Sequence, residues 1–282
     1  MKARLAGQQL VIYTDLDGTL LDAETYAYEA ARPALEALRR HRALVIPCSS
    51  KTRAEMEPWL RELGIHAPFI VENGGAIYLP REEFAAFAPE AEPCGTWARI
   101  ALGVPHARLR SCLEELRRRL AVPIVAWSEL TPEEIAAECG LSREEAERAK
   151  QREYDEPFRV MSDDPTVFSR LEAIVAEHGL RLTRGGRYVH LMGRTDKGRA
   201  VRVLTDTLRR RFGPIFTVGI GDSENDVPML QEVALPILVR RPSGEPDPVA
   251  QRLVPQAHIT RGIGPIGWCE AIWHILAEAE QG

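Results

Sequence analysis

The amino-acid sequence predicts an α/β protein whose parallel sheet carries an inserted α+β domain. Three observations lead to this fold class. Short apolar runs typical of buried strands alternate with helical patterns over residues 10–71. From about Glu83 this alternation gives way to a mixture of strands and helices, and at Lys197 it resumes. Because alternating strands and helices form parallel sheets with right-handed crossovers, the middle block is interpreted as an insertion into one α/β domain.

Three strands and two helices are predicted before the insertion. In chain order they are a strand over 10–13, a helix over 26–40, a strand over 43–47, a helix that ends at 63, and a strand over 68–71. The strands are continuous apolar runs, as expected where both faces of a sheet are buried. Pro33 near the start of the first helix and Gly64 directly after the second favour these helix ends.

The middle block has no regular alternation. Its predicted elements are strands over 97–104, 124–127 and 157–161, helices over 106–120, 141–152 and 165–178, a helix that starts after Thr131, and a hairpin of 180–183 with 188–192. Thr131 before Pro132 and two glutamates is a typical helix start, and Ser142 is a second expected N-cap. The block is therefore expected to be a domain of its own.

The last part of the chain returns to the α/β pattern. It is predicted to contain a helix over 197–212, strands over 215–220, 236–239 and 258–260, a proline-rich loop over 241–248 and a helix over 264–280. A chain of 282 residues is long enough for two domains. We expect a core made of residues 1–82 and 194–282, and an inserted domain of residues 83–193.

Composition excludes several classes of protein. A hydrophobic fraction of 45% with 27% charged residues is typical of a globular protein with a sizeable core. A net charge of -5 argues against a nucleic-acid partner, and the absence of a long apolar run or signal peptide predicts a cytoplasmic protein without a membrane partner. The five cysteines are scattered and form no Cys-x-x-Cys pair, so neither a disulfide framework nor a zinc site is expected.

The first predicted strand leads directly into Asp15-Leu16-Asp17-Gly18-Thr19. In extended chain the side chains of Asp15 and Asp17 project to the same side, so two carboxylates share one site. Like charges at such close range raise each other's pKa or require compensation, for which a divalent cation is the usual choice. The alternative is that these residues form only an acidic turn. An EF-hand calcium loop is a poorer alternative, because the further oxygen ligands that such a loop needs are missing from this stretch.

Polar side chains follow three of the predicted strands, at Asp15, Ser49 and Asp222. The carboxyl ends of parallel strands meet at one edge of a sheet, so residues far apart in sequence are expected to converge in one crevice. Each residue taken alone has a plainer interpretation. Ser49 would then be a helix N-cap, Lys197 a solvated helix start, and Asp222 with Asp226 an acidic turn.

Taken together, these positions resemble the haloacid dehalogenase-like phosphatases. Asp15 and Asp17 match the first motif of that family, Ser49 the second, Lys197 the third, and residues 221–226 the fourth. The four motifs occur in the family's order and span the whole chain. The resemblance implies a Rossmann-like core with a parallel sheet and an inserted α+β cap of the C2B type.

The resemblance also implies roles for these residues. Asp15 would attack phosphorus and form an aspartyl-phosphate, and Asp17 would act as general acid and then as general base. Mg²⁺ would be the cofactor, bound by Asp15, Asp17 through its backbone carbonyl, and Asp222, while Asp226 would hold a water or orient Lys197.

Ser49 and backbone amides near Leu16 and Ser50 would hold the phosphate oxygens in such an enzyme. Ser49 and Lys197 thereby complete the expected catalytic set with Asp15 and Asp17.

Within the family, three stretches resemble the mannosyl-3-phosphoglycerate phosphatases, at 48–53, 72–75 and 152–158. This resemblance implies hydrolysis of mannosyl-3-phosphoglycerate to mannosylglycerate and phosphate. Such a substrate offers a carboxylate to Arg or Lys and hydroxyls to Asn, Gln and His. The candidate substrate-binding residues are Ser50, Lys51, Asn73, Gly74, Gln151, Arg187 and His190.

Other interpretations stay open on sequence alone. The same chemistry could act on a hexose phosphate, sucrose phosphate, glucosyl-3-phosphoglycerate or a phosphomutase's bisphosphate, and the fold could also serve as a catalytically silent sugar-phosphate binding module. Arg187, His190 and Gln151 could equally be a hairpin charge, a strand-face residue and a solvated helix residue. The expected partner is a small phosphorylated glycoside, and the expected assembly is a monomer or homodimer.

Overall fold

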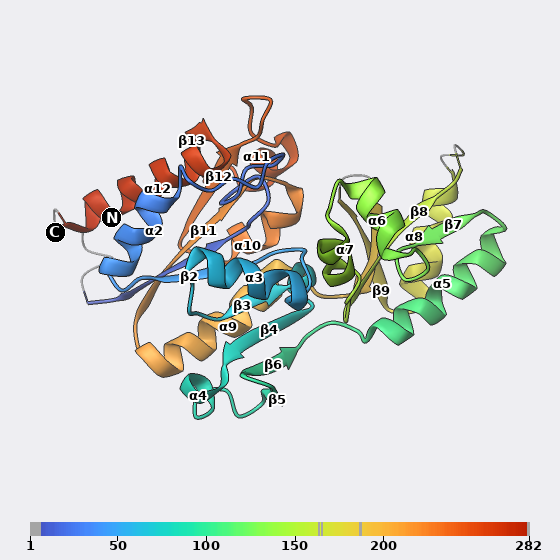
Figure 1. Ribbon diagram of the computed structural model, residues 1–282, viewed down its shortest axis with the longest axis horizontal. Coiled ribbons are helices and arrows are strands. Elements are labelled where there is room, and N and C mark those ends of the chain that lie inside the picture. The colour runs from blue at the N-terminus through green and yellow to red at the C-terminus, as the bar shows by residue number, and fades with distance from the viewer. Residues whose placement is uncertain (1–6, 163, 165, 186–187, 281–282) are drawn as a thin grey trace.

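The structure is a computed structural model that describes residues 7–162, 164, 166–185 and 188–280. The chain forms a larger lobe and a smaller lobe that lie next to each other (Figure 1). The smaller lobe is formed by the middle of the chain and is inserted into the larger lobe, which contains both the blue N-terminal and the red C-terminal parts of the ribbon.

The larger lobe is built on a five-stranded parallel sheet with the order β13-β12-β11-β1-β2. The strands are β1 (Gln9–Thr14), β2 (Leu44–Pro47), β11 (Ile215–Gly221), β12 (Leu235–Arg240) and β13 (His258–Ile263). In β1, Ile12 pairs with Val218 of β11 on one side and with Val45 of β2 on the other. The predicted α/β fold class with a parallel core sheet is confirmed.

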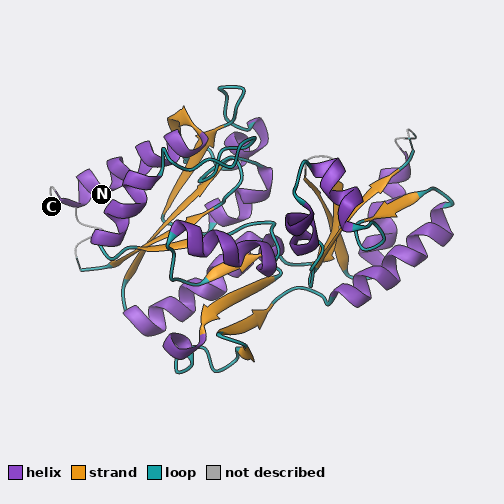
Figure 2. Cartoon of the chain, in the orientation of Figure 1, coloured by secondary structure: helices purple, strands orange, loops and turns teal. Residues whose placement is uncertain are grey.

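Helices cover both faces of the parallel sheet (Figure 2). One face carries α2 (Arg32–Arg40), α3 (Arg53–Leu63) and α12 (Gly264–Glu280), and the other carries α9 (Lys197–Phe212), α10 (Val227–Gln231) and α11 (Pro248–Leu253). Alternation along β1 places Ile12 in the apolar cluster of the first face and Val11 and Tyr13 in that of the second. Strand β1 is therefore buried on both sides, which explains its continuous apolar sequence.

A second, antiparallel sheet with the order β3-β4-β6-β5 extends the larger lobe. It consists of β3 (Phe69–Val71), β4 (Ala76–Pro80), β5 (Glu92–Cys94) and β6 (Trp97–Ala101), with α4 (Arg81–Phe84) after β4. The sequence pattern predicted β3 as a strand of the parallel sheet, yet β3 pairs antiparallel with β4. It meets the parallel sheet through a bridge between Cys48 and Ile70.

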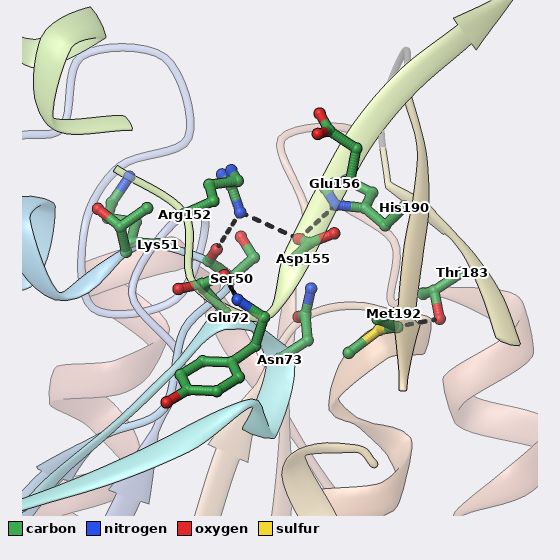
Figure 3. Close-up of polar contacts among 12 residues, drawn as sticks. Ser50, Lys51, Glu72, Asn73, Arg152, Asp155, Glu156, Thr183, His190 and Met192 are labelled. Carbon is green, nitrogen blue, oxygen red and sulfur yellow. Dashed lines mark hydrogen bonds and ion pairs between the residues drawn. The ribbon is translucent and has the colours of Figure 1, made fainter. Parts of the chain in front are cut away.

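The smaller lobe is a four-stranded antiparallel sheet with the order β7-β8-β10-β9 and four helices. Its elements are α5 (His106–Leu120), β7 (Ile124–Ala126), α6 (Pro132–Cys139), α7 (Arg143–Ala149), β8 (Asp155–Val160), α8 (Thr166–Glu177), β9 (Leu180–Gly185) and β10 (Tyr188–Gly193). Apolar side chains of α5 and α8 pack with Phe158 and Leu191 on one face of this sheet. The opposite face, which bears Thr183 and His190, borders the cavity between the lobes (Figure 3).

Helix α2 begins at Arg32, later than the predicted start at residue 26. The reason lies in the preceding loop, where a carboxylate oxygen of Asp22 accepts the backbone N–H groups of Glu24 and Thr25. Tyr26 then has a φ of 58°, in the left-handed region that a helix excludes. The turn delays the helix although the side-chain spacing favours it.

Strand β4 and helix α11 are among the elements that the sequence pattern did not predict. Strand β4 follows Gly75 directly, with too few intervening residues to be recognised as a separate strand. Helix α11 starts at the end of the predicted proline-rich loop, where Pro248 occupies the first helical turn and the side chain of Asp247 accepts the N–H of Ala250. In the described part of the chain, the length and apolarity of the helices are insufficient for crossing a bilayer.

Candidate active site

Asp15, Asp222 and Lys197 meet at the carboxyl edge of the parallel sheet. Asp15 directly follows β1, and its backbone N–H donates to the carbonyl oxygen of Ile220 in β11 at 2.9 Å. Asp222 directly follows β11, and Lys197 is the first residue of α9, which packs against the same sheet. The structure thus brings together the residues that match the first, third and fourth motifs.

Lys197 is fully buried between two carboxylates. Its Nζ lies 2.7 Å from Oδ1 of Asp15 and 2.6 Å from Oδ1 of Asp226. The second carboxylate oxygen of Asp226 accepts the backbone N–H groups of Asp222 and Ser223 at 3.0 and 3.2 Å. Because a buried ammonium is costly unless it is paired, this double pairing fixes Lys197 beside Asp15. Asp226 therefore orients the lysine and shapes the loop after β11.

The donor atoms around Asp15 fit a hard divalent cation. Carboxylate oxygens of Asp15, Asp222 and Asp226 lie within 4.8 Å of one another. Burial, opposed by the charge of Lys197, raises the pKa of Asp15 above its usual range, and burial together with the charge of Asp226 raises the pKa of Asp222 to about 7. Oδ1 of Asp17 is buried without a hydrogen-bond partner among the described residues. Crowded oxygen ligands of this kind suit Mg²⁺ or a similar ion.

The turn after Asp17 depends on glycine. Gly18 has a φ of 80°, and a Cβ atom there would lie 3.0 Å from Oδ2 of Asp222. A side chain at this position would therefore strain the backbone and press on the acidic cluster. Oγ1 of Thr19 donates to Oδ1 of Asp222 at 3.4 Å, a contact that was not predicted although Thr19 belongs to the first motif.

The loop after β2 brings Ser49 and Lys51 to the same edge. Ser49 is buried, and its Oγ accepts the backbone N–H of Lys51 at 3.2 Å. Nζ of Lys51 lies 2.8 Å from Oδ2 of Asp17 and 5.0 Å from the ring centroid of Tyr26. Thr52 then starts α3 with a capping box. In this structure Lys51 is thus paired with the second acid of the first motif.

A cavity of about 510 Å³ opens at this edge, and both lobes contribute to its wall. The larger lobe supplies nine of the lining residues, and Thr183 and His190 come from the smaller lobe. The complete lining comprises Asp15, Asp17, Ser50, Asn73, Thr183, His190, Asp222, Ser223, Glu224, Asn225 and Asp247. Of the predicted substrate-binding residues, Ser50, Asn73 and His190 therefore face the cavity.

None of the other predicted substrate-binding residues that the structure describes lines this cavity. A Cβ atom on Gly74 would lie 2.1 Å from the carbonyl oxygen of Asp196, so this glycine permits a close approach of two backbone segments. Gln151 is exposed, donates to the carbonyl oxygen of Glu147, and is not part of the cavity wall. Arg187 lies outside the described residues.

A polar contact joins the two lobes beside the cavity (Figure 3). The buried carboxylate of Glu72 accepts the backbone N–H groups of Glu153 and Tyr154, and Nη1 of Arg152 donates to the carbonyl oxygen of Ser50 at 3.2 Å. Burial raises the pKa of Glu72 to about 7. Both segments belong to the stretches that resemble the mannosyl-3-phosphoglycerate phosphatases, but neither sequence by itself predicts that the two contact each other.

Comparisons with known proteins agree with this geometry. Residues 12–87 match the family model of haloacid dehalogenase-like hydrolases. A glucosyl-3-phosphoglycerate/mannosyl-3-phosphoglycerate phosphatase of Methanococcoides burtonii is 42% identical over 268 residues, covering 95% of this chain and 97% of that protein. A protein of the same name from Persephonella marina is 37% identical over 275 residues, covering 97% of this chain and 99% of the relative.

A solved structure supports the two-lobed fold. The sucrose-phosphatase of Synechocystis sp. PCC6803 superposes with a TM-score of 0.60 at 18% identity, covering 95% of this chain and 98% of that one. At this identity the likeness concerns the fold alone. Because it covers nearly the whole chain, it includes the inserted antiparallel sheet as well as the parallel sheet.

Proposed function

Because this chain belongs to the haloacid dehalogenase-like hydrolases and is closely related to glucosyl/mannosyl-3-phosphoglycerate phosphatases, we propose that it hydrolyses mannosyl-3-phosphoglycerate to mannosylglycerate and phosphate. The names of both relatives include the glucosyl ester, so we propose that glucosyl-3-phosphoglycerate is a second substrate. The reaction class is hydrolysis of a phosphoric monoester.

One observation carries this proposal above all others. Lys197 is held between Asp15 and Asp226, and Asp222 completes a cluster of carboxylates around Asp15, which lines the cavity. A nucleophilic carboxylate needs nearby positive charge before it can approach a phosphate group. Lys197 supplies part of that charge directly at one oxygen of Asp15.

The proposed reaction proceeds in two steps. Asp15 attacks phosphorus, the bond from phosphorus to the glycerate oxygen breaks, and Asp17 gives a proton to that leaving oxygen. Asp17 then takes a proton from water, which attacks phosphorus and releases phosphate from Asp15. Ser49 with the backbone amides near Leu16 and Ser50 would hold the other phosphate oxygens through hydrogen bonds.

Mg²⁺ is the proposed cofactor. Asp15, Asp222 and the backbone carbonyl of Asp17 would hold it, and Asp226 would support the site through Lys197 and through the loop after β11. When bound, Mg²⁺ supplies charge that offsets the repulsion between the substrate phosphate and the carboxylates.

The organisation of the chain is part of the proposal. The sequence-based division into a core of residues 1–82 and 194–282 and a cap of residues 83–193 stays a prediction. Strands β5 and β6 belong to the same sheet as β4 and not to the sheet of the smaller lobe. We therefore propose that residues 83–101 belong to the core and that the cap begins at α5, later than the predicted boundary at residue 83. Substrate recognition is assigned to the cap residues that line the cavity.

The direct test is phosphate release from both sugar phosphoglycerates, measured with and without Mg²⁺ beside glucose 6-phosphate and sucrose 6-phosphate. We expect the sugar phosphoglycerates to have the highest kcat/KM. Asp15→Asn should lower phosphate release by at least about 10,000-fold, because the nucleophile is lost. Equal turnover by this variant would refute the assignment of Asp15. Binding of the substrates without phosphate release by the wild-type protein would instead indicate a silent binding module.

A further inference from the structure

The proposed substrate carries a carboxylate in addition to its phosphate, and the cavity wall is acidic. Five of the lining residues are carboxylic acids, namely Asp15, Asp17, Asp222, Glu224 and Asp247. Among the described residues that line the cavity, His190 is the only one whose side chain can carry a positive charge. The nearby Lys51 is paired with Asp17 and is not part of this wall. A second anionic group of the substrate therefore finds, among the described residues of the wall, one partner that can carry the opposite charge.

The fold places Asp155 directly behind His190. The strands β8 and β10 pair antiparallel, with His190 opposite Pro157 and Met192 opposite Asp155. Residues two apart on a strand share a face, so the side chains of Asp155 and His190 are diagonal neighbours on the face toward the cavity. Nδ1 of His190 lies 2.7 Å from Oδ2 of Asp155 (Figure 3).

Asp155 is built to stay charged although it is buried. Its side chain is fully buried, and Nη1 of Arg152 donates to the same Oδ2 at 3.0 Å. Burial alone would raise the pKa of Asp155, but the charges of His190 and Arg152 outweigh burial and hold the pKa of Asp155 below its usual value. Arg152 also donates to the carbonyl oxygen of Ser50, which ties this pair to the loop of the larger lobe.

The other ring nitrogen of His190 is available to a ligand. The His190 side chain is 12% exposed, and within the described ranges no protein atom accepts from or donates to its Nε2. In the imidazolium form both ring nitrogens donate, and Asp155 is the counter-ion for that form. With Nδ1 committed to Asp155, the ring can offer Nε2 to the cavity.

We propose that Asp155 is a positioning residue, which holds His190 so that Nε2 donates to the carboxylate of the sugar phosphoglycerate. This inference rests on the proposed function and names the part of the substrate that the cap selects. Phosphate esters without a carboxylate would gain nothing from this contact. The pair therefore confers preference for phosphoglycerate esters over ordinary sugar phosphates.

The chain offers a matched control on the next residue. Glu156 is as fully buried as Asp155, and its Oε2 lies 2.7 Å from Nε2 of His106. Because neighbouring residues of a strand point to opposite faces, this second pair lies away from the cavity, and neither Glu156 nor His106 lines it. Asp155→Asn and Glu156→Gln each remove a buried carboxylate charge beside a histidine.

The experiment compares Asp155→Asn, Glu156→Gln, His190→Gln and the wild-type protein. For each, kcat and KM are measured with mannosyl-3-phosphoglycerate and with p-nitrophenyl phosphate, which lacks a carboxylate. We expect Asp155→Asn and His190→Gln to raise KM for the sugar phosphoglycerate about 10- to 100-fold, with a much smaller change in kcat. The preference for this substrate over p-nitrophenyl phosphate should fall by the same factor, and Glu156→Gln should preserve it.

Four results would overturn the inference. Equal losses on both substrates in Asp155→Asn and His190→Gln would indicate a structural role, and an equal loss of preference in Glu156→Gln would indicate a general effect of buried charge. If Asp155→Asn fails to fold, an unchanged preference in His190→Gln alone excludes the contact. If the wild-type protein hydrolyses p-nitrophenyl phosphate but not the sugar phosphoglycerate, the proposed function itself fails, and the inference with it.

Discussion

The two lobes bring polar side chains together at the cavity in different ways. In the larger lobe, Asp15, Lys197 and Asp222 come from three distant segments and meet because parallel strands end at one edge. In the smaller lobe, Asp155 and His190 meet because neighbouring antiparallel strands present them on one face. In the proposed mechanism the first arrangement gathers charge around Asp15, whereas the second would present the side chain of His190 to the rest of the substrate.

This difference predicts that substitutions in the two lobes have different effects on activity. Changes in the larger lobe should alter turnover of every phosphate ester, because each ester reacts at the same atoms. Changes in the smaller lobe should alter the choice among esters, as proposed above for Asp155 and His190. The experiments that follow test this division, beginning with the largest expected effect.

Lys197→Gln should lower kcat about 100- to 1,000-fold for every substrate, because the variant removes the positive charge beside Asp15. The measurement is steady-state phosphate release with mannosyl-3-phosphoglycerate and p-nitrophenyl phosphate. Arg199→Gln, in the first turn of the same helix but exposed, is the control and should keep the wild-type rate. A loss confined to one substrate would break the division between the two lobes.

Asp222→Asn should raise the Mg²⁺ concentration needed for half-maximal activity about 10- to 100-fold, because an anionic ligand is replaced by a neutral one. Titration of Mg²⁺ into protein first treated with a chelator measures this value. Glu232→Gln removes a carboxylate that pairs with Arg202 outside the cluster and should leave the Mg²⁺ requirement unchanged. Equal requirements in Asp222→Asn and the wild-type protein would contradict the assigned ligand set.

The smallest expected change concerns stability at the contact between the lobes. Glu72 has a pKa of about 7 in the folded protein, against an ordinary value of 4.5, because it is buried. Between these two pH values the folded state keeps a proton that the unfolded state has released. The contribution of Glu72 is therefore fully present below about pH 4.5, and the free energy of unfolding falls by about 1 to 3 kcal/mol as the pH rises through 7.

Urea unfolding at pH 5 and at pH 8 measures this effect. Glu72→Gln should show a smaller difference between the two pH values than the wild-type protein, and Glu83→Gln, which removes an exposed carboxylate, should show the wild-type difference. If the free energy of unfolding of Glu72→Gln changes between pH 5 and pH 8 as much as that of the wild-type protein, other groups cause the pH dependence.

The sequence was most informative where one strand or helix carries its own signal. The bounds of α5, α9 and α12 agree with prediction, and the apolar run over residues 10–13 correctly located β1, an inner strand of the parallel sheet. Prediction from the sequence failed where other interactions outweighed the local pattern or where an element was too short to show one. The left-handed turn at Tyr26 delays α2, and β3 joins an antiparallel sheet because β4 follows after one tight turn.

The candidate site shows the same limit. Asp15, Lys197 and Asp222 could be found because each lies in a motif of characteristic spacing at the end of an element. Asp155 could not, because its role depends on the register between β8 and β10, which no local pattern encodes. Gln151 was chosen for its side-chain chemistry, but it lies just after α7, is exposed, and donates to the carbonyl oxygen of Glu147.

The central claim is that Asp15 becomes phosphorylated during turnover. Asp17→Asn should slow the second step more than the first when the leaving group is p-nitrophenolate, which needs no proton to depart. Acid quenching of this variant during turnover, followed by mass spectrometry of its peptides, should then reveal one phosphoryl group on Asp15. Phosphate on a different residue, or turnover without any phosphorylated peptide, would contradict the account.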